Sequence, residues 1–583
     1  MSGMKKLLIY LKDYKKESVL APLFKLLEAF FELLVPLVMA GIIDRGIANN
    51  DKGYIIRMGL CLIALAAIGL TASVTAQFFA AKAAVGFSAK LRQALFNYIQ
   101  DLDFTNIDKV GTSTMITRMT SDINQVQNGV NMVLRLFLRS PIIVFGAMIM
   151  AFTIDVKSAM VFVVAIPLLA VVVMGITFVT IPLYKKVQNG LDRVLATTRE
   201  NLTGVRVIRA FHREAEEEQR FHEENTALLS LQQFVGKISA CMNPVTYMIV
   251  NAAIIVLIYT GAVQVNIGNL SCGEVVAILN YMSQILVELI KLANLIITIT
   301  KALACADRVA QVFEIQEKEG ESKAVAKGTD HGGEDAPYLQ FDHVSLTYAD
   351  AGAETLKDMN FVVNKGETVG VIGGTGSGKS SLINLIPGFY PATEGAVRLQ
   401  GCDIREMEEQ KLRAMVGMVP QKAVLFKGTI RSNLLWGNPD ATEEELWQAV
   451  DLAQAREVVE GKEGKLDAEI AQNGRNLSGG QRQRLTIARA LVRKPEILIL
   501  DDSASALDYA TDAKLRAAIK GLAGSMTTFI VSQRASSIRH ADKIIVLDDG
   551  EMAGVGTHEE LLQNCEVYQE IYYSQYPEER RQA

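Results

Sequence analysis

The sequence predicts a bundle of six membrane-spanning helices followed by a soluble α/β domain. Long apolar segments fill residues 18–300, whereas residues 338–578 have the mixed composition of a soluble domain that alternates strands and helices. A chain of 583 residues, half of them hydrophobic, is also too long for one ordinary domain. We therefore expect two domains that fold in different surroundings.

The chain divides into four segments. Residues 1–17 are basic and amphipathic, and their apolar patch is too short for the core of a signal peptide. We expect them to form an elbow helix that lies along the membrane surface. Residues 18–315 form the expected transmembrane domain, and residues 338–578 form the expected soluble domain. Between them, residues 316–337 are charged and lack apolar periodicity, which indicates a linker.

Six segments provide the roughly 20 apolar residues that a membrane-crossing helix needs. Two long polar loops, 81–127 and 185–241, are rich in lysine and arginine, whereas the short loop 265–272 contains neither. Because basic loops remain in the cytoplasm, we expect both termini, both long loops and the soluble domain to be cytoplasmic. The approximate spans are 18–43, 55–80, 128–154, 158–184, 242–265 and 273–300.

Charge and cysteine content restrict the possible partners. The net charge of −5 gives no indication of a nucleic-acid partner. The six cysteines are scattered without the spacing of a metal site, which is typical of free thiols in a reducing compartment.

Polar side chains inside the apolar spans need a partner or a function because their burial in lipid is unfavourable. Glu28 and Glu32 lie one helical turn apart in the first span, and Asn280, Gln284 and Glu288 recur at four-residue spacing in the sixth. One interpretation is a polar wall of a substrate cavity. The other is a set of paired charges that fix helix packing. The sequence leaves both interpretations open.

A phosphate-binding loop follows a predicted buried strand at 367–372. Residues 373–380 read GGTGSGKS and precede an apolar helix, which is the GxxxxGK[ST] pattern in its strand–loop–helix setting. The backbone N–H groups of such a loop, together with the helix N-terminus, bind phosphates. We expect Lys379 to reach the β- and γ-phosphates of ATP and the Ser380 hydroxyl to bind Mg²⁺. The predicted ATP-binding residues of the loop are Gly373, Gly374, Thr375, Gly376, Ser377, Gly378, Lys379 and Ser380.

A second apolar strand, 497–500, ends in Asp501, a carboxylate that can hold Mg²⁺ at the carboxyl end of a neighbouring strand. Between the two strands lies a segment that directly precedes a helix: Leu477, Ser478, Gly479, Gly480 and Gln481. With this LSGGQ segment the chain resembles the ATP-binding cassette (ABC) superfamily, for which LSGGQ is the signature sequence.

The resemblance implies roles for further residues. Tyr348 matches the aromatic residue that stacks on adenine, and Gln421 matches the glutamine that links the magnesium site to the membrane domain. Ser505 and Asp508 match a loop at the dimer interface. Six spans followed by one cassette resemble an exporter half-transporter of the type IV ABC exporter fold, in which the long cytoplasmic loops contain coupling helices that dock on the cassettes.

Two residues depart from the family pattern. The family places glutamate directly after the Asp501 position to polarise the attacking water, and this chain has Asp502. The missing methylene pulls the carboxylate back by about 1.5 Å, and a misplacement of ~1 Å can slow catalysis on the order of a hundredfold. The family histidine that contacts the γ-phosphate is replaced by Gln533, which can donate a hydrogen bond but cannot share a proton.

These departures predict a site that binds ATP and hydrolyses it poorly. ABC cassettes pair head to tail, so the intact signature should complete an ATP site on the partner. The chain therefore resembles the degenerate-site subunit of a heterodimeric multidrug exporter in a bacterial inner membrane. We expect a second, non-identical half-transporter with the consensus glutamate and histidine, ATP hydrolysis only with that partner, and a hydrophobic or amphipathic substrate. The alternatives are a homodimeric lipid or peptide exporter with slow hydrolysis, and an ATP-gated regulatory membrane protein.

Overall fold

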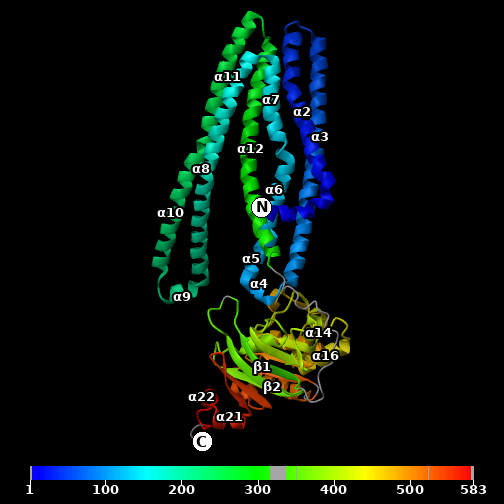
Figure 1. Ribbon diagram of the computed structural model, residues 1–583, viewed down its shortest axis with the longest axis vertical. Coiled ribbons are helices and arrows are strands. Elements are labelled where there is room, and N and C mark those ends of the chain that lie inside the picture. The colour runs from blue at the N-terminus through cyan, green and yellow to red at the C-terminus, as the bar shows by residue number, and fades with distance from the viewer. Residues whose placement is uncertain are drawn as a thin grey trace. The chain divides into compact units, whose positions relative to one another are not determined.

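The computed structural model describes residues 3–315, 337–349, 351–503, 505–522, 524 and 526–579. Almost all of the predicted linker, 316–337, lies outside these residues. The chain divides into two compact units (Figure 1). The first contains Met1–Gln100 and Ser113–Ile315, and the second contains Asp101–Thr112 and Gln316–Ala583.

The first unit consists of long helices. Within the described residues, six helical runs are long and apolar enough to cross a membrane, which confirms the six predicted spans. The segment predicted as an elbow is helical and runs directly into the first span. The helices are α1 (Gly3–Leu7), α2 (Lys15–Gly41), α3 (Lys52–Asp101), α5 (Thr112–Thr117), α6 (Ile123–Leu136), α7 (Arg139–Ile154), α8 (Val156–Thr203), α9 (Val205–Ala210), α10 (Glu214–Ala240), α11 (Met242–Ile267) and α12 (Cys272–Phe313).

These helices are longer than a bilayer is thick. Helix α3 has 50 residues and α8 has 48. At 1.5 Å per residue, 50 residues extend about 75 Å, whereas the hydrocarbon core is roughly 30 Å thick. The helices therefore continue well beyond the lipid, as the long polar loops of the sequence predict.

Helix α12 holds the first unit together, because it packs against α2, α6, α7, α8 and α11. Small residues allow the closest approaches. A Cβ atom at Gly129 of α6 would lie 2.3 Å from the Cβ atom of Ala302 in α12. At the other end of α12, Asp44 accepts hydrogen bonds from the hydroxyl of Ser271 at 2.5 Å and from the backbone N–H of Gly273 at 2.7 Å.

The second unit is built on a six-stranded sheet in the order β12-β11-β3-β10-β9-β6, in which only β12 pairs antiparallel. An antiparallel sheet, β2-β1-β4-β5, and the short pair β7-β8 complete it. The strands are β1 (Leu339–Leu346), β2 (Leu356–Val363), β3 (Thr368–Gly373), β4 (Glu394–Leu399), β5 (Cys402–Asp403), β6 (Val416–Val419), β7 (Gly428–Thr429), β8 (Glu469–Ile470), β9 (Ile497–Asp501), β10 (Thr527–Val531), β11 (Lys543–Asp548) and β12 (Glu551–Gly556).

Strands β9 and β10 are buried along their whole length, which explains their continuous apolar runs. Strand β10 lies between β3 and β9, so the loops that follow these three parallel strands open at one edge of the sheet. The accompanying helices are α13 (Lys379–Leu385), α14 (Glu409–Met415), α15 (Ile430–Leu434), α16 (Glu443–Leu452), α17 (Arg456–Glu460), α18 (Gly479–Val492), α19 (Tyr509–Lys520), α20 (Ala535–Ile538), α21 (His558–Asn564) and α22 (Glu566–Gln575).

The first long polar loop contains a short helix, α4 (Phe104–Val110), that belongs to the second unit. Asp103 caps this helix by accepting a hydrogen bond from the backbone N–H of Asn106 at 2.8 Å. The Phe104 ring lies 4.6 Å from the Phe389 ring, measured between centroids. A coupling helix in this loop stays a prediction from the resemblance.

Candidate nucleotide-binding site

The carboxyl ends of β3, β9 and β10 meet at a cavity of about 250 Å³. The cavity brings together the predicted phosphate loop, the two acidic residues at the end of β9 and the glutamine that follows β10. Its lining includes Thr375, Gly376, Gly378, Lys379, Ser380, Gln421, Asp501, Asp502 and Gln533. The phosphate loop, the two acidic residues and Gln533 therefore form one site, although they are spread over more than 150 positions of the chain.

The glycines of the phosphate loop are required by its geometry. Gly376 and Gly378 have φ angles of +86° and +91°, in the left-handed region that favours glycine. A Cβ atom at Gly373 would lie 2.2 Å from the carbonyl oxygen of Leu547 in β11. The loop can therefore turn its backbone N–H groups inward only with these residues.

Ser380 and Asp501 form an oxygen-rich pair at the base of the loop. The Ser380 hydroxyl donates to the Asp501 carboxylate at 3.0 Å. Burial raises the pKa of Asp501, and the neighbouring charge of Asp502 raises it further. Hydroxyl and carboxylate oxygens are ligands that Mg²⁺ prefers, so the pair fits the predicted magnesium site, with Gln421 on the same cavity wall. When bound, Mg²⁺ would neutralise phosphate charge.

The ammonium group of Lys379 gives the cavity a positive charge. Its ammonium group donates to the carbonyl oxygen of Gly373 at 2.9 Å and to the Ser377 hydroxyl at 3.3 Å. Burial lowers the pKa of Lys379. An ammonium held against the loop in this way lies where the phosphates of a nucleotide would bind.

Asp502 lies directly after β9 in an uncommon backbone conformation. Its φ angle is +43°, which aspartate tolerates better than most residues. The backbone N–H of Asp502 donates to the carbonyl of Val531 at 3.0 Å, and its carbonyl accepts from the Ser505 hydroxyl at 2.8 Å. The main chain is thus fixed on both sides, which leaves the short carboxylate on the cavity wall.

Tyr348, the predicted adenine-stacking residue, is hydrogen-bonded to the first turn of α13. The Tyr348 hydroxyl donates to the Ser381 hydroxyl at 3.0 Å. The Tyr348 ring also makes an edge contact with the ring of Tyr390, with 4.9 Å between centroids. Tyr390 in turn donates a hydrogen bond to Asp108 of α4. The sequence analysis did not identify Tyr390.

The signature residues form the N-terminal cap of α18. The Ser478 hydroxyl accepts from the backbone N–H of Gln481 at 3.3 Å, and the Gln481 side chain accepts from the backbone N–H of Ser478 at 2.9 Å. Leu477 is buried, whereas Ser478 and Gly479 are exposed. A helix N-terminus attracts anions, and none of these residues is among those that line the cavity in the described part of the chain.

The predicted interface loop ends in a second helix cap. The Asp508 carboxylate accepts from the backbone N–H of Thr511 at 2.9 Å at the start of α19, and this hydrogen bond lowers the pKa of Asp508. Ser505 and Asp508 are both exposed.

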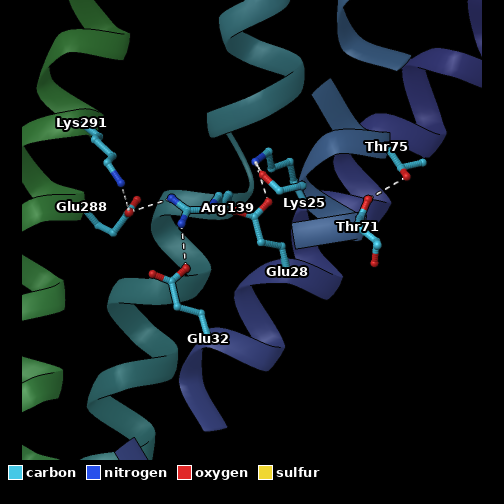
Figure 2. A network of polar contacts seen from close by, with 9 residues as sticks. Lys25, Glu28, Glu32, Thr71, Thr75, Arg139, Glu288 and Lys291 are labelled. Carbon is cyan, nitrogen blue, oxygen red and sulfur yellow. Dashed lines mark hydrogen bonds and ion pairs between the residues drawn. The ribbon is translucent and has the colours of Figure 1, made fainter. Parts of the chain in front are cut away.

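In the first unit, Arg139 joins polar residues of three helices (Figure 2). It begins α7, is 7% exposed, and donates to Glu288 of α12 and to Glu32 of α2, each at 2.7 Å. Glu288 also accepts from the Ser140 hydroxyl at 2.8 Å and from Lys291 at 2.7 Å. Arg139 is not among the residues predicted from the sequence, although an arginine inside the third predicted span is a sufficient signal.

A second pair extends this charge network to α3. Lys25 donates to Glu28 at 2.5 Å and to the Ser73 hydroxyl of α3 at 3.0 Å. The Arg139 guanidinium also lies 3.8 Å from Glu28. Three basic side chains therefore face three acidic ones across α2, α7 and α12, and Ser73 of α3 joins them through Lys25. This arrangement favours the helix-packing interpretation for Glu28 and Glu288.

The other predicted cavity residues have different surroundings. Asn280 is exposed and its side chain donates to the carbonyl of Val276 at 3.0 Å. The side-chain oxygen of Gln284 is buried, and it has no hydrogen-bond partner among the described residues. The Glu32 side chain is 39% exposed.

The fold and the site together define a membrane protein that binds nucleotides. Residues 18–289 match the family of the ABC transporter transmembrane region, and residues 356–505 match the ABC transporter family of the cassette. The chain is 35% identical to YfiB of Bacillus subtilis (strain 168), an uncharacterised ABC transporter ATP-binding protein, over 99% of each chain. It is 32% identical to YgaD of the same organism, provisionally named a multidrug export ATP-binding/permease protein, over 98% of this chain and 99% of YgaD.

Among solved structures, that of a bacterial Atm1-family ABC exporter with ATP bound has the same fold, with a TM-score of 0.76 and 23% identity. The alignment covers 96% of this chain and 98% of that one. The chain belongs to the ABC transporter family, as a half-transporter in which a transmembrane region is fused to one ATP-binding cassette. It is a multi-pass membrane protein, and it couples ATP hydrolysis to transport.

Proposed function

We propose that this chain is one subunit of a heterodimeric ABC exporter that moves hydrophobic or amphipathic compounds out of the cell. ABC exporters act as dimers, so the proposal concerns the identity of the partner and the division of labour between two ATP sites. The site built on Lys379 holds ATP and hydrolyses it slowly. The site that the signature completes belongs to a non-identical subunit with the consensus glutamate and histidine, and this second site drives turnover.

One observation carries the proposal: Asp502 and Gln533 line the same cavity as a complete phosphate loop. The groups that bind phosphate are retained, whereas both groups expected to act on the attacking water and the γ-phosphate are changed. Because a general base must lie within hydrogen-bond reach of its water, the shorter Asp502 carboxylate is poorly matched to this role. The Gln533 amide can still donate to a γ-phosphate, so binding survives the change.

The signature supports the second half of the proposal. Ser478 and Gly479 are exposed at the N-terminus of α18, where backbone N–H groups can meet a phosphate of another subunit. The ATP site on this chain's own phosphate loop is expected to hydrolyse slowly, whereas its signature is intact and exposed. ATP turnover therefore depends on a partner that supplies the hydrolytic residues.

The substrate class is inferred from the membrane unit and from one relative. The spans are apolar, and YgaD carries a name that refers to multidrug export. Of the five residues predicted to line a cavity, Glu32 has a side chain that is 39% exposed, and Gln284 has a buried side-chain oxygen without a hydrogen-bond partner among the described residues. We propose Glu32 and Gln284 as substrate contacts and Asn280 as a further polar group of the cavity, with Glu28 and Glu288 as the paired charges that fix the helices around it.

The proposed orientation places both termini and the cassette in the cytoplasm of a bacterial inner membrane. The excess of lysine and arginine in the two long loops supports this orientation. The bacterial origin of the relatives supports the compartment.

ATPase activity of the purified chain, alone and with the half-transporter encoded next to it, tests the proposal. We expect the lone chain to be nearly silent, the complex to be active and stimulated by amphipathic compounds, and the lone Asp502→Glu, Gln533→His variant to gain roughly tenfold or more in turnover. Adding Lys379→Ala to this variant should remove the gain, which excludes a contaminating ATPase. Full transport-coupled activity of a homodimer would refute the heterodimer, and a complex that never responds to substrate would favour a regulatory protein.

A further inference from the structure

The residue that stands in place of the γ-phosphate histidine is held by the C-terminal helix of the cassette. The side-chain amide of Gln575, the last residue of α22, donates to the backbone carbonyl of Gln533 at 2.8 Å. The same amide accepts from the backbone N–H of Ala535 at 2.9 Å. One side chain therefore binds the main chain on both sides of Arg534.

Other hydrogen bonds also hold the loop from Ser532 to Ala535, and its last two carbonyl groups accept from the backbone N–H groups of Ser537 and Arg539 at 3.1 and 3.0 Å. The backbone N–H of Ser532 donates to the carbonyl of Val371 in β3 at 3.1 Å, and the N–H of Arg534 donates to the Ser532 hydroxyl at 3.0 Å. The N–H of Arg534 and the carbonyl of Gln533 belong to one peptide group, so the Ser532 hydroxyl and the Gln575 side chain hold this peptide group together. Gln575 also binds the N–H of Ala535, the first residue of α20.

Helix α22 is itself firmly docked, so it can act as a fixed support. Tyr568 and Tyr572 are 0% and 2% exposed, and the Tyr568 hydroxyl lies 2.8 Å from Nδ1 of His558 in α21. Earlier in α22, the Gln569 side chain donates to the carbonyl of Leu562 at 2.8 Å and ties α22 to α21. Gln575 lies beyond these anchors and reaches the loop of the nucleotide site.

We infer that Gln575 is a positioning residue for the ATP site: it sets the orientation of the Gln533 main chain and thereby aims the Gln533 side chain at the γ-phosphate. The inference rests on the proposed role of Gln533. It makes the C-terminal helix a part of the machinery that distinguishes ATP from ADP, because only ATP presents a γ-phosphate to the loop.

The test is nucleotide affinity of the purified full-length chain in lipid nanodiscs, measured by calorimetry with Mg²⁺ and either AMP-PNP or ADP. AMP-PNP carries a γ-phosphate and is not hydrolysed, so the result does not depend on turnover. We expect Gln575→Ala to weaken AMP-PNP binding by about five- to tenfold, because two neutral hydrogen bonds, one part-buried and one exposed, are lost, and to change ADP binding less than twofold. Gln575→Glu keeps the acceptor for Ala535 but places a carboxylate against the Gln533 carbonyl, so the same selective loss is expected.

Gln569→Ala is the matched control, because it removes an amide of the same helix that does not touch the loop. This variant should leave the ratio of the two affinities unchanged. Equal losses for both nucleotides, or the same ratio in the Gln575 and Gln569 variants, would overturn the inference and reduce Gln575 to a support for folding.

The Gln533→Ala variant distinguishes the positioning role of Gln575 from the proposed contact between Gln533 and the γ-phosphate. If Gln533→Ala lowers the affinity for AMP-PNP selectively and Gln575→Ala does not, the positioning role is wrong while the role of Gln533 stands. If Gln533→Ala has no selective effect, the proposed contact with the γ-phosphate is wrong, and the inference falls with it.

Discussion

Replacing Arg139 with methionine removes the central cation of the intramembrane charge network. Arg139 is 7% exposed and its main partner, Glu288, is 2% exposed, so neither group can recover hydration from water. Removing one partner of a buried ion pair destabilises a protein by about 3–5 kcal/mol. Glu288 would keep Lys291 at 2.7 Å and Ser140 at 2.8 Å, so we place the effect near the lower limit, about 3 kcal/mol.

A second substitution tests whether this loss comes from the uncompensated charge. Replacing a whole buried pair by apolar residues of similar size is often neutral or stabilising. We therefore expect the Arg139→Met, Glu288→Leu double variant to recover most of the stability that Arg139→Met loses. The control is Lys291→Met, because the Lys291 side chain is 42% exposed and Glu288 keeps its bonds to Arg139 and Ser140, so the expected loss is below about 1 kcal/mol.

The assay is thermal unfolding of the detergent-solubilised chain, followed by size-exclusion chromatography of the folded fraction. An Arg139→Met variant as stable as the parent chain would refute the reasoning. So would a double variant less stable than Arg139→Met alone, because the loss would then come from packing and not from charge.

Three further predictions concern close contacts and the division of the two sites. Gly129→Val should force α6 and α12 apart, because its Cβ atom would lie 2.3 Å from Ala302, and should destabilise the chain by about 1–3 kcal/mol in the same thermal assay; an unchanged transition would contradict it. Gly373→Ala should lower nucleotide affinity at least tenfold by calorimetry, because its Cβ atom would lie 2.2 Å from a β11 carbonyl oxygen, and near-normal binding would contradict the loop geometry. In the partnered complex, Ser478→Arg should abolish ATP turnover whereas Lys379→Ala should mainly shorten ATP retention in a filter-binding assay; equal loss of turnover in both variants would argue against unequal sites.

The ATP site could be predicted because its determinants are local. Each motif follows a strand whose apolar run is visible in the sequence, and neighbouring parallel strands bring their ends to one edge of the sheet. The predicted strands at 367–372 and 497–500 differ from β3 and β9 by one residue at most at each end. Lys379, Ser380 and Asp501 therefore meet as expected.

The charge network could not be predicted in the same way because its partners are distant in sequence. Arg139 is 149 positions from Glu288 and 107 from Glu32, and helix packing alone brings them together. The four-residue spacing of the polar residues in α12 also does not place them all on one face of the helix. Each step of four residues rotates by about 40° around a helix, so Asn280 and Glu288 diverge by about 80°. This rotation explains why Asn280 is exposed while Glu288 is buried, although the sequence suggested one polar face.

The two residues that depart from the family pattern contribute to the fold through their main chains. Asp502 is held by its backbone N–H and carbonyl, and Gln533 by its backbone carbonyl. Residues with other side chains can make the same main-chain contacts. The geometry that binds the nucleotide is therefore separable from the chemistry of hydrolysis in this cassette. The φ angle of +43° at position 502 favours aspartate over glutamate only slightly, by less than about 1 kcal/mol. Restoring glutamate and histidine should therefore change turnover far more than it changes the unfolding temperature, and a large fall in that temperature would mean that these positions also stabilise the fold.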